Sequence, residues 1–226
     1  MYSAITFYLG WKHHCDEGII MGLAPYGNPN SKIPSVNKSY IQVFRDIIKI
    51  DKKNPLKYLI NKDWISYHLE RNKWVSEEFI NVFGKKRNWK DKLSIHHKNI
   101  AAALQKRLEE VVLTQLKYLK NKYKCENLCI SGGVGLNCSL NGKISASNIF
   151  KKIFVQPASG DAGISYGASL LGYYNQKKNK SKTVKNLNSF YLGFRETKKE
   201  TLKNLKKLKV KYTDYDKDIF KITAKK

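Results

Sequence analysis

The sequence has only four cysteines in 226 residues. So small a number does not provide the disulfide framework on which small secreted domains depend. The chain also lacks an uninterrupted apolar run of about 18 residues, which a membrane-spanning helix requires. The apolar start at residues 1–11 has no basic segment before it, so it makes a poor secretory signal. These absences predict a protein of the reducing cytoplasm with no membrane span.

Acidic residues are also scarce: 18 Asp and Glu stand against 43 Lys and Arg, which gives a formal net charge of +25. Such a charge is typical of proteins that bind nucleic-acid phosphates. It also follows from a general abundance of Lys in a chain rich in Asn, Ile and Tyr. The lysines are spread along the chain and concentrate at 177–185 and 198–211, without an aromatic-interleaved recognition motif. We therefore favour a compositional origin over a nucleic-acid partner.

The stretch 99–174 alternates predicted helices and strands. Its clearest helix, 99–123, has apolar residues three or four positions apart. Two short apolar runs, 128–130 and 153–155, are typical of buried strands, and Cys129 is expected in the core. A loop and then a helix follow each run, at 131–137, 138–149, 156–163 and 164–174. This order predicts an α/β fold.

Residues 28–97 show no regular pattern. Apolar patches at 40–50, 64–69 and 79–83 indicate short helices. We expect this segment to be an insertion packed on the α/β core.

The first glycine-rich motif, residues 131–137 with the sequence Ser-Gly-Gly-Val-Gly-Leu-Asn, directly follows a predicted strand. Glycines there let backbone N–H groups approach a phosphate, and the N-terminus of the next helix favours negative charge. The motif lacks the Gly-Lys-Ser/Thr of a P-loop, and Cys138 stands where a dinucleotide fingerprint has glycine. Phosphate binding and a plain tight turn therefore both stay open.

A second motif, Ser159–Gly163, places Asp161 after the next predicted strand. Open α/β sheets bind ligands beyond the carboxyl ends of their strands. A carboxylate there is a hard oxygen ligand for a metal ion. Alternatively, Asp161 caps the helix that starts at Ala162.

A third motif follows the apolar start of the chain. Asp16 and Glu17 precede two glycine turns that end at Gly27. Paired carboxylates in such a setting can hold ribose hydroxyls or act as a base. A surface loop between helices is the alternative.

Together, three motifs in this order resemble the O-carbamoyltransferase family, which includes nodulation and antibiotic-tailoring enzymes. They are Glu17-Gly18 with Met21–Gly27, then Asn127–Cys138, then Phe154–Gly163. The intervening helix around Gln105 and Glu109 matches as well. The resemblance covers most of residues 1–175 and identifies the chain as a partial member of this family.

The resemblance implies an actin-like, sugar-kinase-like ATPase fold for residues 1–175, with 28–97 inserted in it. Full-length members join this domain to a smaller one similar to the YrdC group, which makes carbamoyl-adenylate from carbamoyl phosphate and ATP. The first domain then transfers the carbamoyl group to the hydroxyl of a sugar or another small molecule. A polar linker at 176–188 would lead to 189–226, the truncated start of the second domain, with a basic helix at 200–208.

The resemblance also implies roles for individual residues. Asp161 would bind an iron-type divalent metal together with two histidines four positions apart. Asn137 would contact the nucleotide. Four further residues would line the carbamoyl-adenylate or touch its ribose side: Gly132, Gly133, Gly27 and Glu17.

Two features depart from the family pattern. The adjacent pairs His13-His14 and His96-His97 do not replace histidines four positions apart, because neighbouring side chains on a helix diverge by about 100°. Position 19 is Ile, where the family has Lys. We therefore expect this chain to be inactive alone. The alternatives are a nucleotide-binding remnant, a subunit completed by a separately encoded chain, or a relative of the tRNA threonylcarbamoyl-adenosine transferases.

Overall fold

The computed structural model describes residues 1–176, 190, 193–194, 196–215 and 218–225. The chain divides into two compact units, Met1–Lys178 and Asn179–Lys226. Most of the predicted linker, at 177–188, lies outside the described residues.

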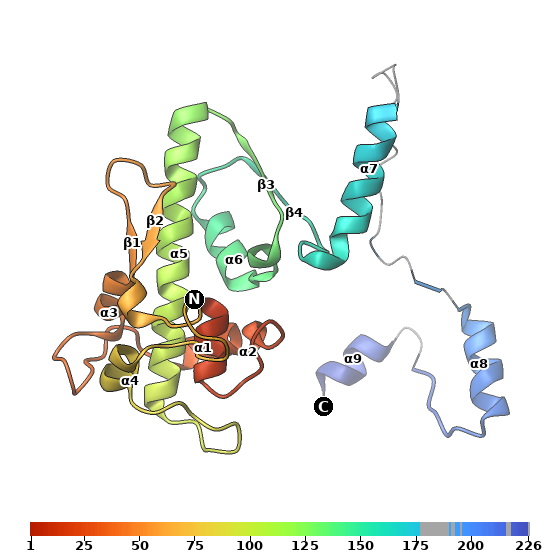
Figure 1. Cartoon of the computed structure of the whole chain (residues 1–226). Coiled ribbons are helices and arrows are strands. Elements are labelled where there is room, and N and C mark those ends of the chain that lie inside the picture. The colour runs from red at the N-terminus through yellow and green to blue at the C-terminus, as the bar shows by residue number, and fades with distance from the viewer. Residues whose placement is uncertain (177–189, 191–192, 195, 216–217, 226) are drawn as a thin grey trace. The chain divides into compact units, whose positions relative to one another are not determined.

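The first unit begins with short helices and one hairpin. In chain order they are α1 (Tyr2–Tyr8), α2 (Glu17–Leu23), the 3-10 helix η1 (Ala24–Tyr26), α3 (Tyr40–Ile47), strands β1 (Ile48–Ile50) and β2 (Tyr58–Ile60), the 3-10 helix η2 (Lys62–Trp64) and α4 (Glu77–Phe83) (Figure 1). β1 and β2 pair antiparallel, with Ile48 opposite Ile60. A capping box at Ser39 and Gln42 fixes the start of α3, because each side chain bonds to the other residue's backbone N–H.

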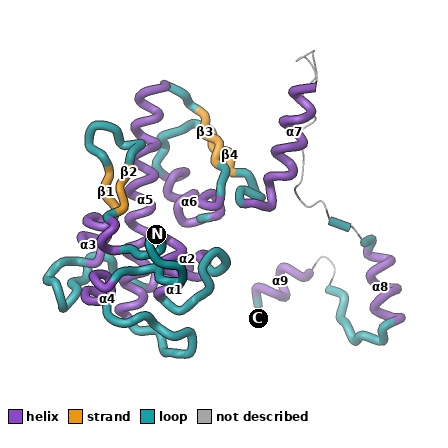
Figure 2. Tube along the Cα trace, in the orientation of Figure 1, coloured by secondary structure: helices purple, strands orange, loops and turns teal. Residues whose placement is uncertain are grey.

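The second half of this unit has the predicted alternation of helix and strand (Figure 2). Its elements are α5 (Ile95–Tyr123), β3 (Asn127–Ile130), the 3-10 helix η3 (Gly133–Leu136), α6 (Cys138–Ala146), β4 (Lys152–Val155), the 3-10 helix η4 (Asp161–Gly163) and α7 (Ile164–Gln176). β3 and β4 pair parallel, with Ile130 opposite Val155. A parallel pair connected through a helix confirms the predicted α/β class.

The 29-residue helix α5, the long green helix of Figure 1, contributes to two apolar clusters. Near its N-terminal end, Ile100 and Leu104 belong to the larger cluster, which also contains residues of α1, α3 and α4. Near its C-terminal end, Leu116 packs with Leu140 and Ile144 of α6. One helix therefore holds both the N-terminal helices and the loop-bearing strands.

Residues 28–97 supply aromatic side chains to the larger cluster. Phe44 and Phe79 are fully buried, and the rings of Phe79 and Phe83 lie 4.4 Å apart between centroids. The helices predicted around 40–50 and 79–83 are present as α3 and α4, although α3 gives way to strand β1 after Ile47.

Three local predictions are wrong. The runs 128–130 and 153–155 form strands, but β3 and β4 alternate exposed and half-buried residues instead of being buried. The patch 64–69 is not a helix beyond the end of η2, because Ile65 instead forms a β-bridge with Val75. Cys129 is exposed rather than part of the core. Alternate residues of a strand face opposite sides, and it is the Leu128 side of β3 that packs on the smaller cluster.

Helix α7 and the described residues of the second unit contain no fully buried residue. α7 has no buried residue. The second unit contains α8 (Lys198–Lys207) and α9 (Ile219–Ala224). Thr197 and Glu200 form a capping box at the start of α8, which confirms the basic helix predicted at 200–208.

Candidate functional site

The two loops that follow β3 and β4 lie side by side. The parallel register places Ile130 and Val155 opposite each other at the ends of the strands. Beyond them, the N–H of Gly132 donates to the carbonyl of Ser159 over 2.7 Å. Both loops therefore leave the sheet at the same edge. Open α/β sheets bind their ligands at such an edge.

The glycine loop keeps its surface open. Gly132 has φ +97°, a left-handed conformation that side chains other than glycine rarely adopt, and no atom lies within 4 Å of a Cβ built on Gly132 or Gly133. Gly135 instead faces the second loop, where an added Cβ would lie 2.9 Å from the Oγ of Ser159. Two glycines thus leave room above the loop, and the third lets the two loops pack closely.

Asn137 ends the glycine loop and starts α6. Its Oδ1 accepts from the N–H of Leu140 over 2.9 Å, which makes it the N-cap of the helix. Its amide also forms two reciprocal hydrogen bonds with the amide of Gln105 in α5, of 2.9 and 3.1 Å. The side chain predicted to contact a nucleotide is therefore held in one orientation by α5 and α6.

A polar network surrounds this pair. Gln105 Nε2 donates to Glu109 over 2.8 Å, and the hydroxyl of Ser139 donates to the same Glu109 oxygen over 3.2 Å. The phenol of Tyr2 in α1 donates to Gln105 Oε1 over 2.9 Å. From the sequence, Gln105 and Glu109 only mark the helix between two of the family motifs. None of these residues had a predicted site role, because they come from three separate segments. A buried Gln on the apolar side of α5 was the available signal.

Burial raises the pKa of the Tyr2 phenol. A hydrogen bond with the Asn137 side chain opposes this shift, while the charges of Glu109 and Glu17 add to it. The phenol is therefore neutral and remains a hydrogen-bond donor to Gln105.

Glu17, the first residue of α2, lies near this network. Burial alone would raise its pKa, but hydrogen bonds from the Ser3 side chain and from backbone N–H groups outweigh that effect and lower it. One of these donors is the N–H of His14, 2.7 Å from the carboxylate. The Sγ of Cys138 lies 3.7 Å from the Sδ of Met21, so α2 also contacts the start of α6.

Gly27 packs against the first turns of α5. A Cβ built on it would lie 2.7 Å from the backbone N of Asn99 and still closer to the carbonyl group of Lys98. The adjacent N–H of Asn28 donates to Asn99 Oδ1 over 2.7 Å. Close backbone packing explains this glycine, while its predicted ribose contact stays a prediction.

Asp161 is exposed and begins η4, two residues after Ser159. The N-cap position of η4 is Gly160, and no side chain caps this turn. The capping alternative for Asp161 therefore finds no support. Among the described residues, no group of three or more His, Cys, Asp or Glu is placed to hold a metal ion.

The two histidine pairs have other partners. His96 bonds through its two ring nitrogens to the phenol of Tyr40 and the carbonyl of Phe83, at 2.6 and 2.7 Å. His97 closes the capping box at the start of α5. The ring of His13 lies 4.3 Å from that of Trp74. These contacts account for the histidines as packing and capping groups.

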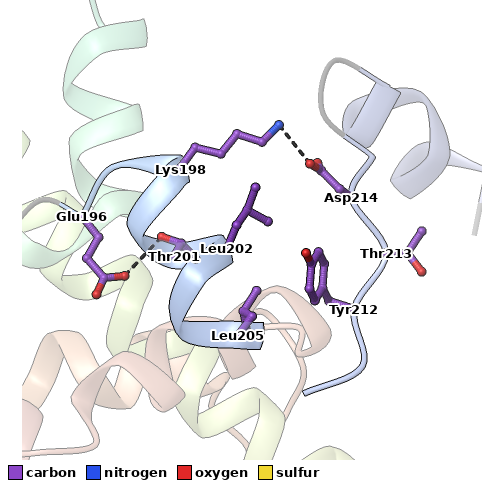
Figure 3. Close-up of a pocket in the computed structure, with 8 residues that line it drawn as sticks. All are labelled: Glu196, Lys198, Thr201, Leu202, Leu205, Tyr212, Thr213 and Asp214. Atoms are coloured by element: carbon purple, nitrogen blue, oxygen red, sulfur yellow. Dashed lines mark hydrogen bonds and ion pairs between the residues drawn. The ribbon is translucent and has the colours of Figure 1, made fainter. Parts of the chain in front are cut away.

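The second unit contains a hollow of its own, of about 380 Å³ (Figure 3). Leu202 and Leu205 of α8 form its apolar wall. Lys198 and Asp214 form an ion pair of 3.0 Å across it. This hollow contains none of the predicted site residues.

No helix in the described part of the chain is long and apolar enough to cross a membrane.

Comparison with known proteins identifies the family to which the chain belongs. The family model for the carbamoyltransferase N-terminus matches residues 1–170, which is most of the chain. The chain therefore belongs to the carbamoyltransferase family.

Three relatives illustrate the match. An uncharacterized protein of Synechocystis is 34% identical over 87% of this chain and 31% of its own length. Nodulation protein NolO of Bradyrhizobium diazoefficiens is 33% identical over 69% of the chain and 25% of its own length. Nodulation protein NolNO of Sinorhizobium fredii is 33% identical over 76% of the chain and 22% of its own length. The chain thus spans about a third or less of the length of these relatives.

Proposed function

We propose that this chain forms part of an O-carbamoyltransferase, in which the glycine loop and the Asp161 loop hold carbamoyl-adenylate. The observation that carries the proposal is the hydrogen bond between Gly132 and Ser159, which joins two open loops at one edge of the sheet. Family membership and the nodulation relatives support the transferase class.

The exposed backbone of Gly132 and Gly133 suits close approach by a phosphate, and α6 directs its N-terminus toward the same loop. Asn137 would add a directional hydrogen bond to the nucleotide. Glu17 and Gly27 would lie on the ribose side.

In the proposed transfer, a hydroxyl oxygen of the acceptor attacks the carbamoyl carbon of the adenylate. A new carbon–oxygen bond forms while the bond to the phosphate oxygen breaks. AMP leaves, and the hydroxyl proton passes to a base outside this chain. The proposed acceptor is a sugar or another small molecule, and the proposed source of the adenylate is carbamoyl phosphate with ATP.

An iron site is proposed only in part. Asp161 would be one ligand, and two histidines would come from polypeptide outside this sequence. With a single carboxylate, the described residues do not by themselves fit such a site, because transition-metal sites normally have three or more protein ligands. No step of the transfer is therefore assigned to a metal.

The proposal extends to the architecture. Residues 1–175 would form part of an actin-like, sugar-kinase-like domain, and 189–226 the start of a YrdC-like one. The four free cysteines suit a cytoplasmic location. A second candidate is a subunit that a separately encoded chain completes. The exposure of two apolar side chains of α7 favours it, since Ile164 is 66% and Leu171 63% exposed.

The direct test is calorimetric titration of the purified chain with AMP, the nucleotide part of the proposed ligand. Asn137→Ala should weaken AMP binding about fivefold, since a lost polar contact costs on the order of 1 kcal/mol. Asn61→Ala is the matched control, because Asn61 likewise caps a helix start but lies at η2. Equal AMP affinity of the folded Asn137→Ala variant and the wild type would refute the proposed site.

A further inference from the structure

The side chain of Gln105 is the most completely engaged polar group near the glycine loop. The residue is only 4% exposed. An amide has two acceptor positions on its oxygen and two N–H donors. Its oxygen accepts from Tyr2 and Asn137, and its nitrogen donates to Glu109 and Asn137. All four positions are filled.

The contacts with Gln105 also occupy hydrogen-bonding positions of the Asn137 amide. The Oδ1 of Asn137 already accepts two hydrogen bonds, from Leu140 N–H and from Gln105 Nε2. An amide oxygen has two acceptor positions, so neither is left for a ligand. One N–H of its Nδ2 group donates to Gln105 Oε1, and a hydrogen bond also links the Asn137 side chain to the Tyr2 phenol, so these contacts fix the orientation of the Asn137 amide.

We propose that Gln105 is a positioning residue for nucleotide binding, which fixes the orientation of the Asn137 amide at the end of the glycine loop. This inference rests on the proposed function and adds to it a residue of α5 to which the family resemblance gives no role. Because Gln105 also bonds to Tyr2, it connects the glycine loop to the N-terminal helices. A buried Gln that only filled space would not affect the orientation of the Asn137 amide.

Gln105→Glu tests this with almost no change of volume. It replaces Nε2, the donor to both Asn137 and Glu109, with an oxygen. The new carboxylate at position 105 then faces the carboxylate of Glu109. Its other oxygen still accepts from the neutral phenol of Tyr2, whose pKa is also raised by the charge of Glu17. When it is ionised, the new carboxylate at position 105 has no donor for Asn137. When it is protonated, it regains one O–H group, which can donate to Asn137 Oδ1 as Nε2 does in the wild type.

We therefore expect Gln105→Glu to bind AMP about tenfold more weakly than wild type at pH 8, with most of the loss recovered at pH 5. The matched control is Gln115→Glu, which makes the same change farther along α5. There the amide only donates to the carbonyl of Leu56, over 3.3 Å. This control should bind AMP like wild type at both pH values. Recovery of AMP affinity at pH 5 without a matching change in the free energy of unfolding separates positioning from a merely structural role.

Amide hydrogen exchange of residues 132–140, compared with wild type at the same pH, separates this inference from the proposed function. Faster exchange in Gln105→Glu at pH 8 but not at pH 5 supports the positioning role, whether or not AMP binds. The positioning role is overturned if exchange in Gln105→Glu is unchanged at pH 8. It is also overturned if the wild type binds AMP and Gln105→Glu binds it equally well. A wild type that does not bind AMP refutes the proposed function alone.

If Gln105→Glu does not fold at pH 8, Tyr2→Phe replaces it, because it removes only one donor to Gln105. A severalfold loss of AMP affinity is then expected. Unchanged affinity and unchanged exchange in this variant would overturn the proposal.

Discussion

Gly27→Ala places a methyl group against the backbone of another helix. The new Cβ would lie 2.7 Å from the N of Asn99 and closer still to the Lys98 carbonyl. Backbone atoms of α5 cannot rotate away as a side chain can, so η1 must shift. The hydrogen bond from Asn28 to Asn99 lies at the same contact and would lengthen.

Overpacking of this kind costs about 1–3 kcal/mol, and the weakened hydrogen bond adds about 1 kcal/mol. We expect a loss of about 3 kcal/mol in the free energy of unfolding. Urea unfolding followed by circular dichroism measures it. Gly22→Ala is the control: no atom lies within 4 Å of its added Cβ, and Ala favours helix α2 by about 1 kcal/mol. Wild-type stability of Gly27→Ala, or an equal loss in Gly22→Ala, would refute the close packing.

Three further predictions concern single side chains. Burial alone would raise the pKa of Glu110, but hydrogen bonds from Arg45 and Arg107 lower it below its ordinary value of 4.5. The ionised Glu110 thus stabilises the fold above about pH 4.5, and this contribution is lost as the pH falls through the folded pKa. Glu110→Gln should therefore reduce the fall in unfolding free energy at acid pH, and an unchanged fall would contradict this. Ser159 has a buried Oγ without a partner in the described chain, so Ser159→Ala should leave the unfolding free energy unchanged or raise it by about 1 kcal/mol, whereas a clear loss would reveal a missing partner. The chain should bind Fe²⁺ weakly until a polypeptide with the two family histidines is added, and Asp161→Asn should remove that gain; full binding by the variant would exclude Asp161 as a ligand.

The strand–loop–helix segments were predictable because their signals are local. The periodicity of α5 and the apolar runs of β3 and β4 each lie within one stretch of sequence. The same local signals placed Gly132 and Asp161 after neighbouring strands. Parallel pairing then brings their loops to one edge.

Contacts between distant segments were not predictable in this way. The pairing of Ile65 with Val75 and the hairpin β1–β2 depend on partners that an apolar patch does not specify. The exposure of Cys129 depends on which face of the strand α5 and α6 cover. The hydrogen bonds of Gln105 join α1, α5 and the glycine loop, and no spacing along the chain indicates them.

The central claim is that the loops after β3 and β4 form one nucleotide site. Titration of the ¹⁵N-labelled chain with AMP, followed by backbone amide chemical shifts, tests it most directly. The account predicts that the largest shifts occur at residues 131–137 and 156–163, with smaller ones near Glu17. Shifts confined to the hollow around Leu202 and Tyr212, or no shifts at millimolar AMP, would contradict it.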